Sequence, residues 1–296
     1  MISLLLATLL ISPSPSDSLA RRFAVAPAES LQVTAVGPTS GPAVVIIPGL
    51  VSPAYAFRKV LPLLTEAGLR AVVIEPLGVG QSGRPGDADY SHTAQAHRVA
   101  AVMDSLGLRQ AVVMGHAVGT AMALRLALAR PDLVKSLLLV EGGALESAAV
   151  PGVKRAIQFS FLVRLFAGRG RIRKEVRKGL IASSGDTTWV TDSLIDRYTE
   201  GPAGDIGAVL RALKGMQRAV EPDSLKPQLS RIHVPVRLLL GGAAHEGGPS
   251  SGRIRTLEHE LPQLTQQVIF ESGLHIHEEQ PKALAEQLVA LAHGGG

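Results

Sequence analysis

Short apolar runs that alternate with helical segments constrain the fold of this 296-residue chain more than any other feature. Because the runs are apolar along their length, they suit strands that are buried on both faces of a parallel sheet covered by helices. We therefore predict an α/β protein with a mostly parallel central sheet, opened by two short strands near Phe23–Val25 and Leu31–Val36. Six apolar runs follow, at 43–50, 69–86, 110–115, 133–143, 234–242 and 265–273.

One region interrupts this alternation. Residues 145–230 lack apolar strand runs and are expected to be helical, with breaks at Gly185 and Pro222. An insertion at this point predicts a helical cap over the carboxyl ends of the strands, where open α/β sheets bind ligands. The core would then consist of 21–144 and 231–296. Helices are expected in it at 55–67, 93–106 and 281–292, and after residue 119.

The N-terminus has the pattern of a secretory leader. Ile2 to Ile11 is almost wholly apolar, which is too short to span a bilayer but matches the apolar part of a signal peptide. Ser18-Leu19-Ala20 supplies small residues for cleavage after Ala20, although no Lys or Arg precedes the apolar run. We expect residues 1–20 to be a signal peptide and the protein to be exported, periplasmic or secreted. A cytoplasmic protein with an apolar tail is the alternative.

Composition excludes several kinds of chemistry. The chain has no cysteine, so disulfides, a thiol nucleophile and thiolate zinc sites are excluded. The formal net charge is +5, and 164–180 is strongly basic, which indicates a solvated helical face or a weak contact with a membrane surface or an acidic partner. Nucleic-acid binding is not expected, because no aromatic residues are interleaved with these charges. The oligomeric state stays open.

A tight glycine turn is the most informative motif. Gly115-His116-Ala117-Val118-Gly119, here called the elbow, joins an apolar strand to a helix. A strained residue between strand and helix needs small neighbours, and Gly115 and Gly119 meet that need. The middle position of such a turn normally carries a nucleophile, but the methyl group of Ala117 cannot attack. His116 is expected to pack rather than to react.

Together, several motifs resemble the α/β-hydrolase fold family, in its capped branch of lipases, esterases, epoxide hydrolases and dehalogenases. The likeness covers nearly the whole chain after residue 22, and the motifs occur in the family's order. They are Ile47-Pro48-Gly49, the loop EPLGVGQSGRP, the elbow, the strand VPVRLLLGG and the segment SGLHIHEEQP.

The resemblance implies an oxyanion hole and a general base. The family builds the hole from backbone N–H groups, which here would be those of Leu50 and Val118. His275 matches the base, and His277 is the alternative because the spacing to the following motif is one residue short.

The family's acid is missing from its usual place, where His245 stands. Glu141 is the first choice for the acid and Glu246 the second, because a carboxylate is needed to orient the imidazole. Ser82 and Thr120 are considered as substitute nucleophiles, each less favoured than an empty position.

Two function classes follow from these residues. One is a hydrolase-type site for a small, mostly apolar ester, lactone or epoxide, whose activity is weak, altered or absent without a serine. The alternative is a non-catalytic, ligand-binding pseudo-hydrolase. Whether Ala117 is natural or a deliberate replacement is left open. No cofactor is implied, because the chain has no phosphate-cradling glycine loop, and His275 and His277 have no third metal ligand that can be nominated.

Overall fold

A computed structural model describes residues 18–147 and 169–294 of the chain. Its strands form one sheet in the order β1-β2-β4-β3-β5-β6-β7-β8. In this described part, β2 pairs antiparallel with both β1 and β4, and every other neighbouring pair is parallel. The strands are β1 Leu19–Ala26, β2 Glu29–Val36, β3 Ala43–Ile47, β4 Arg70–Ile74, β5 Ala111–His116, β6 Val134–Val140, β7 Val236–Gly241 and β8 Leu264–Ile269.

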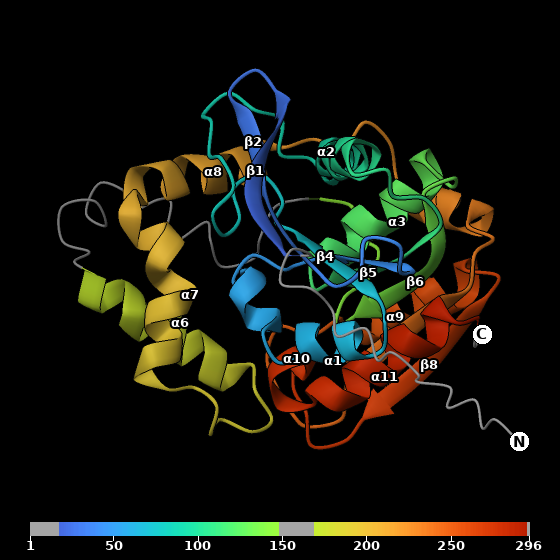
Figure 1. The fold of residues 1–296 in the computed structure, drawn as a ribbon. Coiled ribbons are helices and arrows are strands. Elements are labelled where there is room, and N and C mark those ends of the chain that lie inside the picture. The colour runs from blue at the N-terminus through green and yellow to red at the C-terminus, as the bar shows by residue number, and fades with distance from the viewer. Residues whose placement is uncertain (1–17, 148–168, 295–296) are drawn as a thin grey trace, which may run out of the picture.

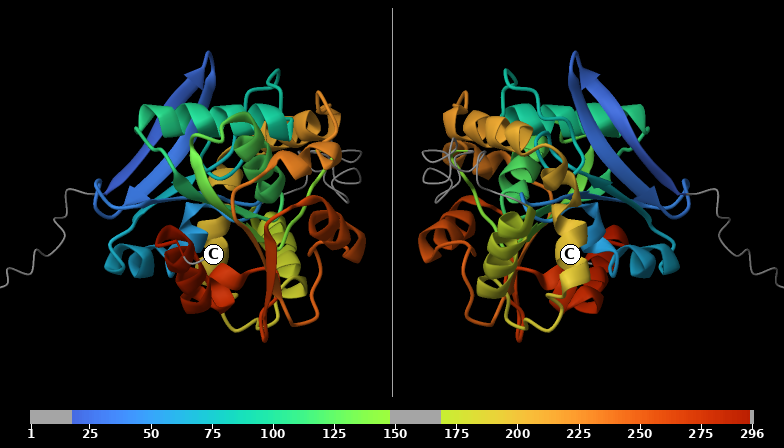
Figure 2. Two further views of the ribbon diagram at one scale, coloured as in Figure 1. Left: turned by 90° about the vertical axis from the view of Figure 1, so that its right-hand side faces the viewer. Right: turned by 90° about the vertical axis from the view of Figure 1, so that its left-hand side faces the viewer.

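Helices cover both faces of the sheet (Figures 1 and 2). The described helices are α1 Leu61–Glu66, α2 His92–Ser105, α3 Gly119–Ala129, α6 Arg169–Ala182, α7 Asp192–Gly204, α8 Ile206–Arg218, α9 Ser251–Glu260, α10 Ile276–Glu279 and α11 Pro281–Ala292. Short 3-10 turns lie at Ala54–Phe57 and Lys226–Arg231. The predicted helix at 55–67 is therefore a 3-10 turn followed by the short α1.

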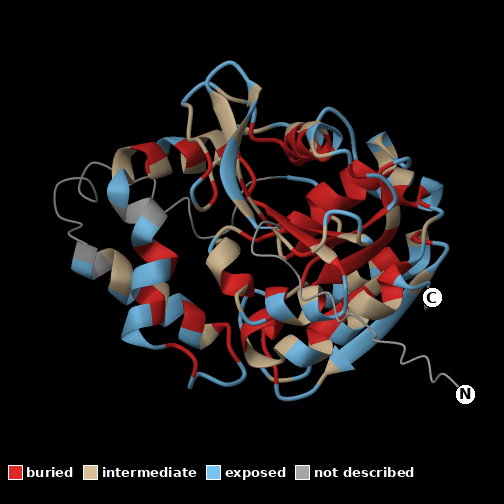
Figure 3. Cartoon of the chain, viewed as in Figure 1, coloured by how far each residue is buried: buried red, intermediate tan, exposed pale blue. Residues whose placement is uncertain are grey.

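The apolar character of the central strands reflects burial from two sides (Figure 3). Val45 and Ile47 of β3 pack in the core cluster that contains α2 and α3, whereas Val44 and Ile46 pack with α1 and α11. The predicted α/β fold is confirmed. The edge strand β8 differs from expectation, since its four middle residues are exposed. It pairs with β7, and no described strand lies on its other side.

Helices α6, α7 and α8 lie within the region predicted to be a cap, and in Figure 1 they stand to one side of the sheet. Helix α7 contacts α6, α8 and the 3-10 turn at Ala54–Phe57. Residues 148–168 of the predicted cap lie outside the described residues. Two arginines of the basic segment 164–180 form ion pairs with α7: Arg173 with Asp192 and Asp196, and Arg177 with Asp192. Membrane contact through this segment stays a prediction.

Most of the predicted signal peptide, residues 1–17, also lies outside the described part of the chain. Leu19 and Ala20 belong to β1, where they pair with Ala35 and Thr34 of β2. The predicted cleavage after Ala20 therefore falls within a strand, and export stays a prediction. Within the described residues, no helix combines the length and apolarity that crossing a membrane requires.

Candidate functional site

The elbow forms a sharp bend at the carboxyl end of β5. Ala117 has a φ of 50°, in the left-handed region that side chains other than glycine rarely adopt. A Cβ at Gly115 would lie 2.5 Å from the Gly119 carbonyl oxygen, and a Cβ at Gly119 would lie 2.3 Å from that of Ile47. Both glycines are required by close backbone approach, so the bend has the geometry that its sequence indicates.

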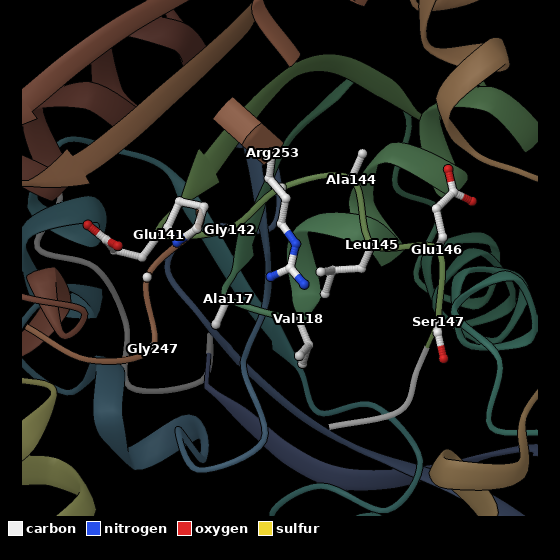
Figure 4. A pocket seen from close by; sticks show the side chains of 13 residues that line it. Ala117, Val118, Glu141, Gly142, Ala144, Leu145, Glu146, Ser147, Gly247 and Arg253 are labelled. Atoms are coloured by element: carbon white, nitrogen blue, oxygen red, sulfur yellow. The ribbon is translucent and has the colours of Figure 1, made fainter. Parts of the chain in front are cut away.

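A pocket of about 710 Å³ lies beside Ala117. In Figure 4 the guanidinium of Arg253 extends from α9 toward Ala117 and Val118. Like Ala117, the lining residue Glu141 has a φ of 50°. Two strained residues thus border one pocket, which is where functional sites commonly hold strain. The lining consists of Ala117, Val118, residues 141–147, residues 247–249 and Arg253.

The fold places Leu50 and Val118, whose amides were predicted to form an oxyanion hole, at the same small cavity. Leu50 and Val118 both line a very small cavity of about 10 Å³ next to the elbow. A Cβ on Gly49 would lie 3.3 Å from the Cβ of Ala117, so the loop that carries Leu50 lies against the bend. Within the described residues, neither the Leu50 nor the Val118 N–H donates a hydrogen bond. Both donors therefore remain able to bind a ligand oxygen.

The substitute nucleophiles considered from the sequence are both occupied. The Thr120 hydroxyl lies 2.6 Å from the Ala117 carbonyl oxygen and 3.0 Å from that of Gly143. The Ser82 hydroxyl donates to the Glu75 carbonyl at 2.7 Å and accepts the backbone N–H of Gln32 at 2.8 Å. Since both side chains are buried and neither lines the pocket, neither replaces the missing oxygen.

Glu141 is paired with His245. The carboxylate Oε2 lies 3.1 Å from Nε2 of His245, whose Nδ1 lies 2.8 Å from the Ala243 carbonyl oxygen. A carbonyl only accepts, so Nδ1 carries a proton, and the contact between Nε2 and Oε2 needs a second proton. Burial raises the pKa of Glu141, although the Gly241 amide and His245 act in the opposite direction. The pair therefore holds a proton at the pocket wall that can be donated or withdrawn.

His275 lies outside the pocket lining and is fully buried. Its Nε2 is 2.8 Å from the hydroxyl of Ser183, directly after α6, and its Nδ1 has no hydrogen-bond partner. Burial lowers the pKa of His275 to about 3, and the nearby His116 and His245 act in the same direction. The imidazole is therefore neutral at physiological pH.

Neither predicted acid reaches this imidazole. Glu141 faces His245 instead, and Glu246 is exposed, with its backbone N–H bonded to Ala182. Within the described residues, no carboxylate is hydrogen-bonded to His275. The structure thus does not assemble the predicted triad of an elbow residue, His275 and an acid.

His277, the alternative base, belongs to a buried cluster with His116 and His275. The ring centroid of His116 lies 4.8 Å from that of His277 and 6.1 Å from that of His275. Burial lowers the pKa of His116 to about 4 and that of His277 well below its ordinary value. Four ring nitrogens lack hydrogen bonds: Nδ1 of His116, Nδ1 of His275 and both nitrogens of His277. Each such group costs roughly 1–3 kcal/mol of folding free energy when nothing pairs with it.

The comparisons with known proteins agree with this architecture. A family profile described as alpha/beta hydrolase fold matches residues 42–168. The uncharacterized hydrolase YugF of Bacillus subtilis (strain 168) is 24% identical, over 82% of this chain and 87% of its own length. An epoxide hydrolase of Caballeronia sordidicola is 34% identical, over 36% of this chain and 32% of its own. The solved structure of Cfl2 from Burkholderia cenocepacia has a TM-score of 0.76 at 24% identity, covering 92% of this chain and 95% of that one. The chain has the α/β-hydrolase fold, and its residues 42–168 match the model of that family.

The sequence did not predict two of the hydrogen-bond partners at this site, His245 and Ser183. His245 stands in the family's acid position, so its pairing with Glu141 had a signal only as a departure from the pattern. Ser183 carried no signal, because it lies 92 residues from His275 along the chain. The third histidine of the buried cluster, His116, was expected only to pack.

Proposed function

We propose that this protein binds a small, mostly apolar ester, lactone or epoxide in the elbow pocket without forming a covalent intermediate. The observation that carries the proposal is the methyl group of Ala117 at the pocket wall, where the family places its nucleophile. A methyl group has no lone pair to attack a carbonyl carbon, so covalent catalysis from this position is excluded.

The lining supports a ligand with a polar end and an apolar body. The free amide of Val118 in the lining and that of Leu50 in the adjoining small cavity suit a carbonyl oxygen, and the exposed Arg253 adds a positive charge. Ala144 and Leu145 supply apolar wall. A volume of about 710 Å³ falls in the range typical of small-molecule pockets.

The surroundings of His275 support the absence of acyl-enzyme turnover even with a serine in place. Its Nε2 is engaged by Ser183, and no described carboxylate orients the ring. Triad catalysis needs the imidazole to accept the nucleophile's proton and a carboxylate to stabilise the resulting cation. A serine at residue 117 would therefore restore the nucleophile of a triad but neither the available imidazole nor the carboxylate that orients it.

A second function is favoured by the Glu141–His245 pair. When Nδ1 of His245 carries the only proton of the pair, the Glu141 carboxylate could accept a proton from a water in the pocket while that water attacks a carbonyl held by the Val118 amide, and the accepted proton then lies between Oε2 and Nε2. General acid–base catalysis of this kind contributes roughly 10²–10⁴-fold. The chain would then be a slow hydrolase acting without a covalent intermediate.

Kinetics with p-nitrophenyl butyrate test the proposal. We expect no burst in the unchanged protein, and for Ala117→Ser a rise in kcat/KM below about 10-fold, because the imidazole stays unavailable. A burst in Ala117→Ser that His275→Ala abolishes would show an intact serine mechanism and contradict us. Steady hydrolysis by the unchanged protein that Glu141→Gln lowers at least about 10-fold would favour the second function.

Binding is tested separately with a series of γ-lactones of increasing chain length, followed by calorimetry. We expect affinity to rise with chain length and to fall when Ala144→Phe fills the pocket. Lys282→Ala, on α11 and away from the pocket lining, is the control. Equal affinity in Ala144→Phe and in the unchanged protein would rule out binding at this site.

A further inference from the structure

The buried histidine cluster behind the elbow contains three potential metal ligands. One ring nitrogen from each of His116, His275 and His277 lies within 4.8 Å of those of the other two. We propose that these side chains bind one late first-row transition-metal ion, with Zn²⁺ as the best match. Neutral imidazoles are the ligands that such ions prefer, and three of them form a common ligand set.

Hydrogen bonding leaves a lone pair of His116 free. Its Nε2 lies 3.0 Å from the Leu274 carbonyl oxygen. Because a carbonyl can only accept, Nε2 carries the proton and Nδ1 is the unprotonated nitrogen. That Nδ1 is buried and has no partner among the described residues.

The same reasoning applies to His275. The Ser183 hydroxyl lies 2.8 Å from the Gly179 carbonyl oxygen, so its hydrogen is directed there. It then accepts from Nε2 of His275, which leaves the unpartnered Nδ1 as a free donor to a metal. Metal-binding histidines typically donate their second N–H to a carbonyl or another oxygen in this way, which orients the ring.

His277 is free to complete the set. Neither of its ring nitrogens is hydrogen-bonded, so the ring can turn without losing a bond. With metal–nitrogen distances of about 2.0–2.1 Å, tetrahedral ligands lie about 3.4 Å apart. Nitrogens at the 4.8 Å limit must therefore approach one another by about 1.4 Å, so the proposal includes small movements of the rings.

A purely packing role explains the cluster less well. The rings do pack, with Phe57 4.8 Å from His277 and Trp189 5.2 Å from His275 between centroids. Apolar rings would fill this space without burying four unpaired nitrogens. A bound ion would accept the free lone pairs and tie the elbow to α10 and to His275 at its N-terminus, leaving its fourth position to a small exogenous ligand.

Metal titration of the full chain, purified without a polyhistidine tag and treated with a chelator, tests the proposal. We expect saturable 1:1 binding of Zn²⁺ by calorimetry and visible absorption bands typical of tetrahedral coordination with Co²⁺. His277→Phe should weaken Zn²⁺ binding at least about 100-fold, and Ser183→Ala about 10–100-fold, the range typical of partners that orient a ligand. His259→Ala, whose side chain is 84% exposed, should leave binding unchanged.

Two features keep the test decisive. Phenylalanine at 277 keeps a ring beside Phe57 and removes two unpaired nitrogens, so the metal-free variant should be at least as stable as the unchanged protein. If it fails to fold, Ser183→Ala still reports on the site. No saturable binding, binding that survives His277→Phe and Ser183→Ala, or loss of binding in His259→Ala would each overturn the proposal.

Discussion

The two sides of the elbow differ sharply, although one turn supplies both. Ala117 presents its methyl group to a pocket whose buried titratable lining group, Glu141, is paired with His245. Its neighbour His116 is fully buried among rings whose nitrogens mostly lack partners. The buried carboxylate on the pocket side is paired within the protein, whereas four ring nitrogens on the histidine side have no partner among the described residues. Unpaired backbone amides support the ligand proposed for the pocket, and unpaired ring nitrogens support the ion proposed for the histidine cluster.

Both sides depend on the elbow backbone, so breaking the bend should have the largest effect. Gly119→Ala places a Cβ 2.3 Å from the Ile47 carbonyl oxygen, and no side-chain rotation relieves a clash between backbone atoms. We expect the free energy of unfolding, measured in urea, to fall by at least about 3 kcal/mol. Gly179→Ala in α6, where a Cβ meets nothing within 4 Å, should instead add about 0.5–1 kcal/mol. Equal stability of the two variants would show that the bend is not needed.

The second-largest effect is expected from acid, which should lower the folding stability through the buried histidines. Burial lowers the pKa of His116 to about 4 and that of His275 to about 3, whereas unfolded histidine has a pKa of about 6.5. Below about pH 6.5 the unfolded chain binds more protons than the folded one. The free energy of unfolding therefore decreases as the pH is lowered, until the pH reaches the pKa of the folded histidine. Each histidine contributes up to about 1.4 kcal/mol per pH unit.

Urea unfolding at pH 7.5, 6 and 5 measures this loss. The pKa of His277 is also lowered by burial. His277→Phe should therefore reduce the change in unfolding free energy per pH unit by the contribution of one histidine. His259→Ala, at an exposed position, should leave the slope unchanged. A slope that is equal in the unchanged protein and His277→Phe would show that the cluster is not the acid-sensitive element.

The smallest effect is expected on the pocket side. Glu141→Leu removes the acceptor of the Gly241 N–H and should cost about 1–3 kcal/mol. Glu141→Gln keeps an acceptor oxygen for Gly241 and can donate its amide hydrogen to Nε2 of His245, so its cost should stay below about 1 kcal/mol. Thermal unfolding of both variants at pH 7.5 measures the difference. If both variants lose the same stability, charge rather than hydrogen bonding holds Glu141.

Much of the fold could be read from the residues in order. Apolar runs predicted the central strands because burial from two sides demands them, and Gly115 and Gly119 predicted the bend because nothing larger fits. The exposure of β8 was not predicted, since whether a strand lies at the edge depends on the order of strands in the sheet. The features that were predicted correctly, the central strands and the bend, are local consequences of side-chain size and periodicity.

By itself, the sequence determined the α/β architecture, the strained turn and the methyl group at its apex, because neighbouring residues set each of them. Tertiary structure alone decided which groups meet. It turned Glu141 toward His245 and joined His275 to Ser183 across 92 residues. It also brought His116, at the end of β5, against the histidines before α11. Pairings of this kind depend on how distant segments pack, and no local preference along the chain encodes them.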